Sequence, residues 1–443
     1  MRSIEFIHDS SWQDLPDQVR GQARRCLLDT IGAALGGRQS RLSQIIHDFA
    51  AAVYGGQGAQ LWLDGRQVSP PGAALANGMT MDALDVHDGH TLTKGHAGAA
   101  LVPAVLATLS LDRGDKINGQ ELLTSLVVGY EVALRAGLAL HATVNDYHTS
   151  GAWNALGCAA ITARRLKTNS DQTRHALGIA EYHGPRSQMM RCIDHPTMLK
   201  DGSGWGAMAG VSAALLAVNG FTGAPALTVE SGESAEYWAD LEERWLITEQ
   251  YFKPHAVCRW AQPAVTGAVN MRKRYNFSLD TVKRIRIVTF HEAVRLASRH
   301  PETTEEAQYC LPFPVAAALV HQRLGPAELS GENLDHPLVY QLAECVELVE
   351  DPAYSERFPA ERLARVQIET VDGAFFDSGE VEATWGAEDP PANKVLRDKF
   401  HWLARTTLSD VRARKLEEMI WQVADLPDIV TLLDLLTSPT NLE

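Results

Sequence analysis

The amino-acid sequence predicts a mainly α protein with a second domain of the α+β class. Three observations support this fold class. Apolar residues recur at helical spacing almost throughout from Leu15 to about Gly220, strand-like alternation begins after about Pro263, and helical spacing returns after residue 392. We therefore expect a large all-helical domain over residues 1–260, a smaller α+β domain over residues 261–390, and a helical tail over residues 391–443 that rejoins the first domain.

Segments rich in apolar or small residues predict the helices of the first domain. The segment that starts at Leu15 has a proline next in the chain and ends before two glycines, which is typical of one complete helix. The segment after Asn118-Gly119 is apolar on most faces and predicts a buried helix. Two Ala- and Gly-rich segments predict closely packed helices, and Gly220 with Gly223 should end the second. The four helices are expected at residues 15–35, 119–140, 154–169 and 205–225.

The second domain is predicted from alternating apolar and polar residues. Residues 282–293 alternate as a strand does, and residues 364–386 have the pattern of two strands joined at Asp372-Gly373, a hairpin signal. Between them, residues 308–324 predict a buried helix that begins behind two prolines. This mixture of strands and helices is what places the second domain in the α+β class.

Length, composition and charge limit the classes of protein that this chain can be. Its 443 residues suffice for two or three domains, and 45% apolar with 21% charged residues are ordinary for a globular enzyme. The formal net charge of −15 argues against a nucleic-acid partner, which would need a basic surface. An anionic ligand would need a local group of cations, so any cluster of Lys, Arg and His is informative here.

Targeting features predict a cytoplasmic protein that does not enter a membrane. The N-terminus lacks the basic-then-apolar layout of a signal peptide, and no apolar run approaches the roughly 20 residues of a membrane span. The six cysteines are scattered without a CxxC pair, so we expect reduced thiols, with Cys258 alone beside a polar segment.

One stretch, DALDVHDGHTLTKGHAGAALVPAVLA, places many titratable groups directly before a buried helix. Three explanations are open: ligands of a metal ion, a polar loop that caps the helix, or a site that transfers protons. No HExxH or H-x-H motif supports the metal site. We favour proton transfer, because burial tunes the pKa values of carboxylates and imidazoles toward neutrality. The groups are Asp82, Asp85, His87, Asp88, His90, Lys94 and His96.

Two further segments have the same layout of a polar loop followed by a small-residue helix. Tyr147 and His148 stand before an Ala-rich helix, where they either donate to an anionic ligand or belong to an ordinary N-cap region. Lys200 precedes a glycine-bearing turn and another such helix. This lysine is either a solvated surface group, a carboxylate ligand or, if burial lowers its pKa, a base.

A fourth segment, YFKPHAVCRWAQPA, lies at the predicted domain boundary. Lys253, His255 and Arg259 fall within seven residues there, in a strongly acidic chain. The segment is either a solvated basic loop or one wall of a cleft between domains. Together the four segments predict one pocket that contains acids, bases and several cations.

These segments resemble the motifs of the MmgE/PrpD family, in the same order along the chain. The stretch ALDVHDGHTLTKGHAGAALVPA is similar to the family pattern ALDFDDTH…HPS…PA, and YHTSGAWNALGCAA is similar to its histidine-bearing turn. KDGSGWGAMAGVSAALLAVNGFTG, KPHAVCRWAQPAVTGA and CLPFPVAAAL resemble three further motifs of the family. The resemblance covers nearly the whole chain.

The resemblance implies a large helical domain, a smaller α+β lid domain and a homodimer, without a metal or an organic cofactor. The family's known activities include 2-methylcitrate dehydration, cis-aconitate decarboxylation and iminodisuccinate epimerisation, all on small di- or tricarboxylates. By position, it assigns active-site places to Asp85, His96, His148, Lys200 and Lys253.

The sequence departs from the family pattern at positions that bear on the choice of activity. The lost hydroxyl and imidazole groups favour a site that does not expel a tertiary hydroxyl group, as a dehydratase must. The departures are His87 for an acidic residue, Gly89 for Thr, Ala97 for Pro, Gln262 for His and Phe313 for Tyr.

We therefore predict an epimerase that acts on an iminodisuccinate-like imino or amino dicarboxylate by two-base proton exchange. Lys200 and Tyr147, which stands where the family often has Phe or Trp, would be the opposed bases. The alternatives are a lyase of the same family, of the 2-methylcitrate dehydratase or cis-aconitate decarboxylase type, and an inactive carboxylate-binding protein. Catalytic roles are predicted for Lys200, Tyr147, His148, Asp85 and His96, and substrate contacts for His87, Asp88, Lys253, Arg259, Gln262 and Phe313.

Overall fold

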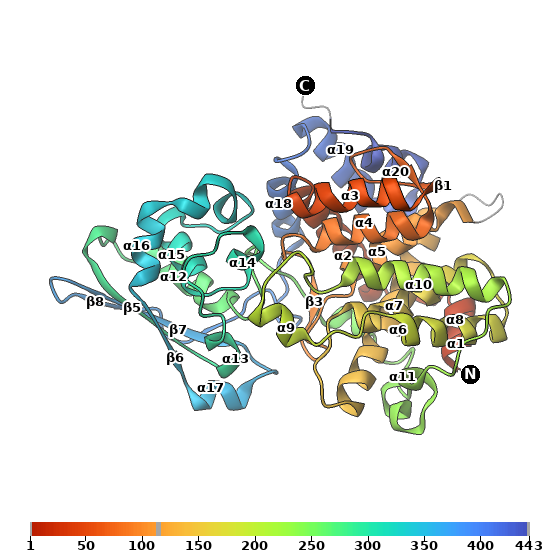
Figure 1. The fold of residues 1–443 in the computed structure, drawn as a ribbon, viewed down its shortest axis with the longest axis horizontal. Helices are drawn as coiled ribbons and strands as arrows, with labels where there is room; N and C mark the ends of the chain where they lie inside the picture. The colour runs from red at the N-terminus through yellow and green to blue at the C-terminus, as the bar shows by residue number, and fades with distance from the viewer. Residues whose placement is uncertain (1, 112–116, 441–443) are drawn as a thin grey trace.

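The structure, a computed structural model, describes residues 2–111 and 117–440. A larger, mostly helical body adjoins a smaller part that contains a mixed sheet, which confirms the predicted fold class (Figure 1). Short 3₁₀ helices connect many of the elements; they are η1 (Trp12–Asp14), η2 (Leu109–Leu111), η3 (Gly232–Trp238), η4 (Leu246–Glu249), η5 (Leu279–Thr281), η6 (Ala327–Leu329), η7 (Gly331–Asp335) and η8 (Val423–Asp425).

The body is formed by helices from both ends of the chain. Helices α4, α5, α6, α7 and α10 pack at its centre, and the C-terminal helices α18–α20 lie on top of it in Figure 1. The helices of the body are α1 (Arg2–Asp9), α2 (Asp17–Gly37), α3 (Arg41–Val53), α4 (Pro70–Asp82), α5 (Gly98–Ala107), α6 (Gly119–Thr143), α7 (Gly151–Arg165), α8 (Ser170–His183), α9 (Met189–Asp194), α10 (Ser203–Val218), α11 (Leu227–Glu230), α18 (Asn393–Ala404), α19 (Asp410–Trp421) and α20 (Val430–Thr437).

Helices α7 and α10 pack as closely as their small residues predict. Gly206 and Gly210 lie one turn apart on α10 and contact the backbone of α7. A Cβ atom at Gly210 would stand 2.3 Å from the carbonyl oxygen of Ala155, so no larger residue fits there. The close approach also brings together the polar residues that precede the two helices. The Ser150 N–H donates to Asp201 Oδ1 at 3.0 Å.

The sequence suggested that no apolar segment is long enough to span a membrane, whereas helix α6 has that length. Among the described residues it alone is long and apolar enough to cross a membrane, with 25 residues. Its most apolar window is 94% buried inside the body, as expected of a core helix. The helix begins where predicted, because the Asn118 side chain caps it by accepting the Glu121 N–H at 2.8 Å.

The smaller part is a sheet covered by short helices. Its strands run in the order β6-β5-β7-β8, with β5 parallel to β6 and antiparallel to β7, and β9 also pairs with β7. The strands are β5 (Val282–Thr289), β6 (Val346–Glu350), β7 (Leu363–Thr370), β8 (Phe375–Asp377) and β9 (Val381–Glu382). The helices are α12 (Gln262–Arg274), α13 (His291–Val294), α14 (Thr304–Gln308), α15 (Pro312–His321), α16 (Pro337–Glu344) and α17 (Pro352–Arg357).

Two details of the smaller part test the sequence patterns. The predicted hairpin is confirmed: β7 and β8 are joined at Asp372-Gly373, and Gly373 has a positive φ of 86°, which glycine adopts without strain. The buried helix expected within residues 308–324 is confirmed as α15, which is shorter than the segment. It begins at Pro312, because proline has no N–H to donate and suits the first turn of a helix.

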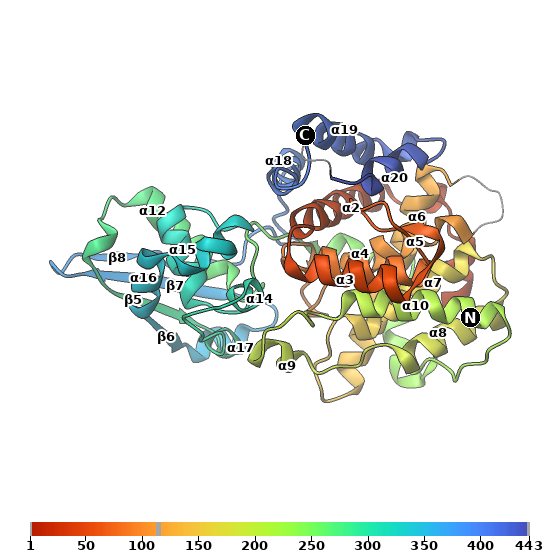
Figure 2. The ribbon, with the colours of Figure 1, turned by 45° about the horizontal axis from the view of Figure 1, so that its top comes forward.

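The C-terminal tail packs on the body rather than on the sheet. Helices α18 and α19 lie against α2 in both ribbon views (Figure 2). On α18, Lys399 Nζ donates to Asp29 Oδ1 of α2 at 2.6 Å and to the carbonyl oxygen of Val86 at 2.6 Å. Lys399 and Asp29 are both buried, so a buried ion pair joins the tail to α2. The hydrogen bond to Val86 joins the tail to the loop that follows α4.

The sequence predicted an all-helical body, and this prediction is wrong in detail because the body also contains short strands. Short strands pair within its loops: β1 (Gly55–Gln60) with β2 (Gln67–Val68), and β3 (Gly89–His90) with β4 (Gln250–Tyr251). These strands are too short to show alternation in the sequence. The β3–β4 pair matters for the site, because it places the loop before α5 beside the residues that follow β4.

The buried pair between Lys399 and Asp29 gives a test of the fold. Lys399→Met would leave the Asp29 carboxylate buried without its cation, and the free energy of unfolding should fall by about 3–5 kcal/mol. Lys394→Met on the same helix is the matched control, because its pair with Asp398 is exposed and should contribute little. Urea denaturation measures both, and equal losses would contradict the role of Lys399.

Candidate active site

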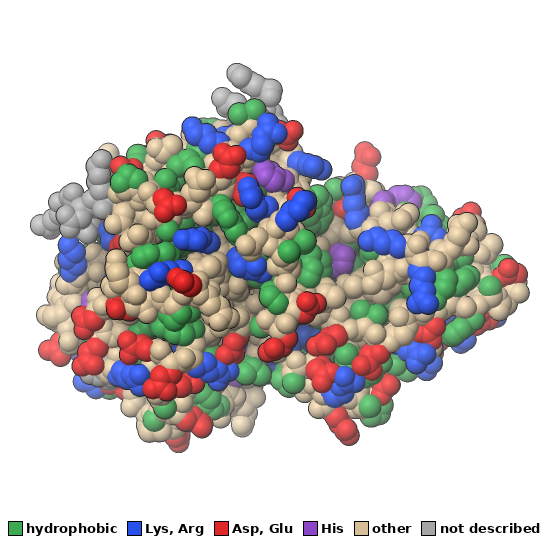
Figure 3. Space-filling view, turned by 180° about the vertical axis from the view of Figure 1, so that it is seen from behind, with side chains coloured by type: hydrophobic (Ala, Val, Ile, Leu, Met, Phe, Trp, Pro, Cys, Tyr) green, Lys and Arg blue, Asp and Glu red, His purple; other side chains and the backbone are tan. Residues whose placement is uncertain are grey.

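A small cavity is lined by residues of the body and of the smaller part. Seen from behind, the surface is hollowed where the two parts meet (Figure 3). Its free volume is about 20 Å³, room for roughly one water molecule, so a larger ligand needs the lining residues to move apart. The lining comes from three of the four predicted segments, all but the one that holds Lys200, and from the smaller part: Asp85, Lys94, His96, Tyr147, Met189, Ile193, Tyr251, Cys258, Arg259, Trp260, Tyr309 and Arg362.

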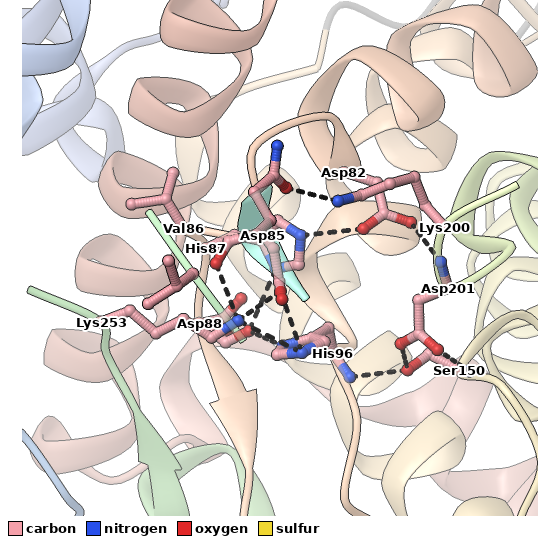
Figure 4. Close-up of polar contacts among 12 residues, drawn as sticks. Asp82, Asp85, Val86, His87, Asp88, His96, Ser150, Lys200, Asp201 and Lys253 are labelled. Carbon is pink, nitrogen blue, oxygen red and sulfur yellow. Dashed lines mark hydrogen bonds and ion pairs between the residues drawn. The ribbon is translucent and has the colours of Figure 1, made fainter. Parts of the chain in front are cut away.

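Three titratable side chains meet at this cavity: Asp85 and His96 line it, and Lys253, which is fully buried, contacts both from behind the lining (Figure 4). Lys253 Nζ forms an ion pair with Asp85 Oδ1, donates to the Asp85 carbonyl oxygen at 2.9 Å, and lies 3.4 Å from His96 Nε2. His96 Nε2 is also 3.5 Å from Asp85 Oδ1. The Lys253 ammonium therefore occupies the position that a metal ion would take between these two side chains. Within residues 2–111 and 117–440, no three His, Cys, Asp or Glu side chains are grouped as metal ligands.

The backbone around this cluster is held in uncommon conformations. Asp85 and Lys200 both have positive φ values, 47° and 51°, a region that non-glycine residues rarely adopt. The β3–β4 pair joins Gly89 to Tyr251, two residues before Lys253. A Cβ atom at Gly89 would lie 2.5 Å from the Tyr251 hydroxyl and 2.7 Å from a ring nitrogen of His96. Only glycine fits there, so the threonine of the family pattern is sterically excluded in this packing.

His96 is held as a neutral base. Its Nδ1 lies 2.7 Å from the carbonyl oxygen of Asp88, which can only accept, so the proton is on Nδ1 and Nε2 carries a lone pair. Burial, then the charge of Lys253, keeps the pKa of His96 well below its usual value. Asp85 is held as a carboxylate: burial alone would raise its pKa, but the Lys253 charge lowers it far below the usual range.

Lys200 lies behind the cluster rather than at the cavity surface. It is 1% exposed, its Nζ donates to Gln308 Oε1, and it sits 4.7 Å from the centre of the Tyr309 ring, which lines the cavity. The expectation of a solvated surface lysine is wrong. Gln308 is held in turn by a hydrogen bond from its Nε2 to the carbonyl oxygen of Ala83 at 3.0 Å.

Tyr147 lines the cavity, but its contacts do not suit the predicted role of a base. Its hydroxyl donates to the carbonyl oxygen of Lys94, and the Lys94 Nζ lies 4.4 Å from the centre of its ring. Burial, followed by the nearby Asp201, raises the pKa of Tyr147 well above its usual value. The phenol therefore keeps its proton, and two opposed bases at Lys200 and Tyr147 are not supported by this arrangement.

His148 and His87 are positioned outside the cavity lining. His148 Nδ1 donates to the carbonyl oxygen of Asp146 at 2.9 Å, and its ring stacks on His141. His87 is fully buried behind the cluster, where Nε2 lies 3.2 Å from Asp82 Oδ1. Its ring packs edge-on against His96, 4.7 Å between centres, so His87 supports His96 rather than contacting a ligand.

Three of the predicted substrate contacts are structural in this conformation. Asp88 accepts the Tyr130 hydroxyl at 2.7 Å, and burial raises its pKa to about 6. Gln262 ties the preceding loop together, because its Nε2 donates to the carbonyl oxygens of His255 and Val257. Phe313 is fully buried at the start of α15. These side chains lie outside the cavity because local packing, not sequence distance, decides which way each one points.

Comparison with known families identifies the chain at this point. The MmgE/PrpD N-terminal domain matches residues 3–235, more than half of the chain, and the MmgE/PrpD C-terminal domain matches residues 255–425. The chain belongs to the MmgE/PrpD family. The resemblance seen in the sequence motifs is therefore confirmed at the level of the family.

Several named proteins are similar to this MmgE/PrpD chain over most of their length. Cis-aconitate decarboxylase of Aspergillus terreus (strain NIH 2624 / FGSC A1156) is 24% identical, over 97% of this chain and 94% of the relative. Cis-aconitate decarboxylase of Homo sapiens is 26% identical, over 98% and 93%. The mitochondrial 2-methylcitrate dehydratase of Yarrowia lipolytica (strain CLIB 122 / E 150) is 23% identical, over 89% and 82%. None of these three carries the name of an epimerase.

The sequence reasoning missed residues that connect the motifs of this MmgE/PrpD protein. The Ser150 hydroxyl contacts both the His96 N–H, at 2.8 Å, and Asp201 Oδ2. Asp201 is also linked to Asp82, whose Oδ2 accepts its N–H at 3.3 Å. Asp201 directly follows Lys200 in the sequence, which was a signal available at the outset. Arg362 had none, because it lies just before β7, about 50 residues beyond Phe313, and belongs to no motif.

Asp201 gives a pH-dependent test of this network. Burial, followed by the charge of Asp82, raises the pKa of Asp201 to about 8. The folded chain keeps a proton there that the unfolded chain loses above about pH 4, so the free energy of unfolding should fall as pH rises from about 4 to 8. Asp201→Asn mimics the protonated form and should flatten this fall by up to about 1.4 kcal/mol per pH unit.

Denaturation curves across that pH range measure the difference for the MmgE/PrpD protein and its variant. Asp280→Asn is the control, because Asp280 is exposed on the smaller part. If Asp201→Asn and Asp280→Asn have the same pH profile as the unchanged protein, Asp201 does not hold its proton in the folded state.

Proposed function

We propose that this MmgE/PrpD protein is a lyase that decarboxylates a small tricarboxylate of the cis-aconitate kind. The single observation that carries the proposal is the one-sided cluster of Lys253, Asp85 and His96 at a closed cavity with several cations. Two of the similar proteins named above are cis-aconitate decarboxylases, and they match this chain nearly end to end. Decarboxylation with reprotonation needs one proton donor and cations that bind carboxylates.

The Lys253 ammonium is suited to be that proton donor. Its three hydrogens face the Asp85 carbonyl oxygen, the Asp85 carboxylate and His96 Nε2, and the contact with His96 is the longest at 3.4 Å. A bound substrate can replace this contact at the least cost. Asp85 offsets the charge of the ammonium, and His96, whose pKa is lowered by burial and by the charge of Lys253, stays neutral and adds no second positive charge beside it.

The proposed step balances with one proton consumed. The bond between a carboxylate and the carbon that bears it breaks, CO2 leaves, and the freed electron pair forms a new carbon–carbon double bond. The electron pair of the former double bond takes up the Lys253 proton at carbon, and solvent restores that proton. The cations that line the cavity, among them Arg259, would hold the remaining carboxylates and stabilise the negative charge that develops.

Decarboxylation fits this site better than dehydration. A dehydratase needs an acid that protonates the leaving hydroxyl group. Gly89 has no hydroxyl, Phe313 has none and is fully buried, and Gln262 uses its Nε2 on two main-chain carbonyls. The side chains at these departures from the family pattern therefore offer no such acid at the cavity.

Epimerisation of an iminodisuccinate-like substrate is the second candidate. The same missing leaving-group acid favours it, because proton exchange at carbon expels no hydroxyl group. It requires a second base opposite the first, and the pKa of Tyr147, raised by burial, weighs against Tyr147 in that role. We therefore rank the epimerase below the lyase.

One experiment separates the candidates. The protein is incubated with cis-aconitate, 2-methylcitrate and iminodisuccinate in D2O, and each reaction is followed by NMR. We expect CO2 from cis-aconitate and one deuterium in the unsaturated dicarboxylate product. Water loss from 2-methylcitrate would replace this proposal by dehydration, and deuterium in iminodisuccinate without CO2 would replace it by epimerisation. No reaction with any of the three would favour a carboxylate-binding protein.

Variants of the cluster test the assignment of the proton donor. Lys253→Met and His96→Gln should each lower kcat for decarboxylation by about 10²–10⁴-fold, because general acid–base groups contribute that much. His175→Gln is the matched control, since His175 on α8 contacts only the Gly223 backbone in the described structure and lies outside the cavity. Lys200→Ala tests the other buried lysine, and we expect a raised KM from the loss of its charge beside Tyr309.

If Lys253→Met keeps full activity while Lys200→Ala loses all of it, the proton donor is Lys200 and the cluster has another role.

Assembly and location stay predictions. The family resemblance is the support for a homodimer, and size-exclusion chromatography with light scattering tests it. A cytoplasmic location is tested by fractionation of cells that produce the protein.

A further inference from the structure

Two buried arginines line the mouth of the cavity. Among the described residues, neither forms an ion pair with an acidic side chain. Arg259 follows β4 and Arg362 precedes β7, so the two come from segments about 100 residues apart in the chain. Their exposed fractions are 7% and 4%. Both line the cavity, and both also line a larger groove of about 870 Å³ that runs between the body and the smaller part.

The hydrogen bonds of these guanidinium groups go to main-chain carbonyl oxygens. Arg259 donates to Phe252, Ala383 and Thr384 at 2.8–3.2 Å. Arg362 donates to Pro359 at 2.6 Å and to Thr91 at 3.1 Å. Within the described ranges, neither Nε–H has a partner, and no carboxylate lies within the 4.0 Å of an ion pair from either group.

This arrangement leaves two positive charges buried close together without a counter-ion. The charges of Arg259 and Arg362 act on each other, and burial lowers the pKa of both groups, that of Arg259 to about 10. Lys94, which also lines the cavity, has its pKa lowered by burial and then by the charge of Arg362. Carbonyl oxygens solvate a guanidinium but do not neutralise it, so burying these two cations is costly unless an anion binds between them.

Other positions for the missing anion are filled or distant. Asp85 is already paired with Lys253 at the opposite wall. Glu292 and Glu382 act on Arg362 and Arg259 only at longer range, beyond ion-pair distance. The aromatic face of Tyr251, 4.1 Å from the Arg259 guanidinium, orients that group without adding a formal charge. A planar guanidinium with a free N–H matches a carboxylate in shape as well as in charge.

We propose that Arg362, together with Arg259, binds a second carboxylate of the substrate at the mouth of the cavity, across from Lys253. This inference rests on the proposed function, in that the cavity takes small carboxylates. It adds that the substrate needs at least two carboxylates, one at each wall. Arg362 is thereby a specificity-determining residue, and it joins the substrate to the smaller part of the molecule.

The contact between Arg362 and Thr91 gives this binding mode a mechanical consequence. Arg362 donates from the start of β7 to a loop of the body, so it already bridges the two parts. A carboxylate held by Arg259 and Arg362 would draw the segment before β7 toward the segment after β4, next to this contact. Substrates with a second carboxylate would then favour the closed cavity, and monocarboxylates would not.

The test compares two unreactive ligands on the intact protein. Tricarballylate is a saturated tricarboxylate, and butyrate is its counterpart with one carboxylate; NMR titration gives a Kd for each. Arg362→Gln should raise the Kd of tricarballylate at least tenfold and the Kd of butyrate less than twofold. Arg362→Lys keeps the charge but loses the bidentate hydrogen-bond donor, and it should raise the Kd of tricarballylate by about threefold or more. This variant also tests the proposal if Arg362→Gln does not fold.

Arg299→Gln is the matched control. Arg299 lies in the smaller part, donates to the main-chain carbonyl of Val346 at 2.7 Å, and within the described residues also has an unpartnered Nε, but it is remote from the cavity lining. The Arg299→Gln variant should bind both ligands with the same Kd as the unchanged protein. If the Arg362 variants weaken tricarballylate and butyrate equally, or not at all, the second subsite is wrong while the proposed function stands. If the unchanged protein binds neither ligand, both proposals fail.

Discussion

Lys253 and Asp85 form a buried ion pair that joins the loop before α5 to the loop after β4. Neither side chain is more than 3% exposed, so removing one partner would leave an uncompensated charge in the interior, at a cost of about 3–5 kcal/mol. The pair holds Asp85 in its left-handed backbone conformation and sets the charge state of His96, which lies within 3.5 Å of both side chains.

Elements remote from the cavity hold this pair in place. Lys399 on the C-terminal tail binds the Val86 carbonyl oxygen, the residue after Asp85, and is itself neutralised by Asp29. On the other side, the small residues of α7 and α10 let Ser150 and Asp201 meet behind His96. The body side of the site is therefore held in place by several buried contacts.

Charge is distributed across the cavity in a way that suits an anion of several carboxylates. One wall carries a lysine that is neutralised by Asp85, and the other carries arginines that lack an acidic partner among the described residues. The contact with Asp85 offsets the charge of the Lys253 ammonium and orients it, whereas guanidinium groups without an acidic partner can bind an anion firmly. This division between a proton donor and an anion holder explains why a chain of net charge −15 concentrates cations at one place.

The sequence by itself determined the fold class, most helices, the hairpin at Asp372-Gly373 and the grouping of Asp85, His96 and Lys253 at one site, because periodicity, turn chemistry and motif order are local properties. Tertiary structure alone decided which polar side chains face the cavity. Gln262 and Phe313 occupy motif positions yet point into the packing, and Arg362 lies in no motif yet reaches the cavity. The physical reason is that side-chain direction and counter-ion placement depend on contacts between segments far apart in the chain, here the short β3–β4 pair and the junction of the two parts.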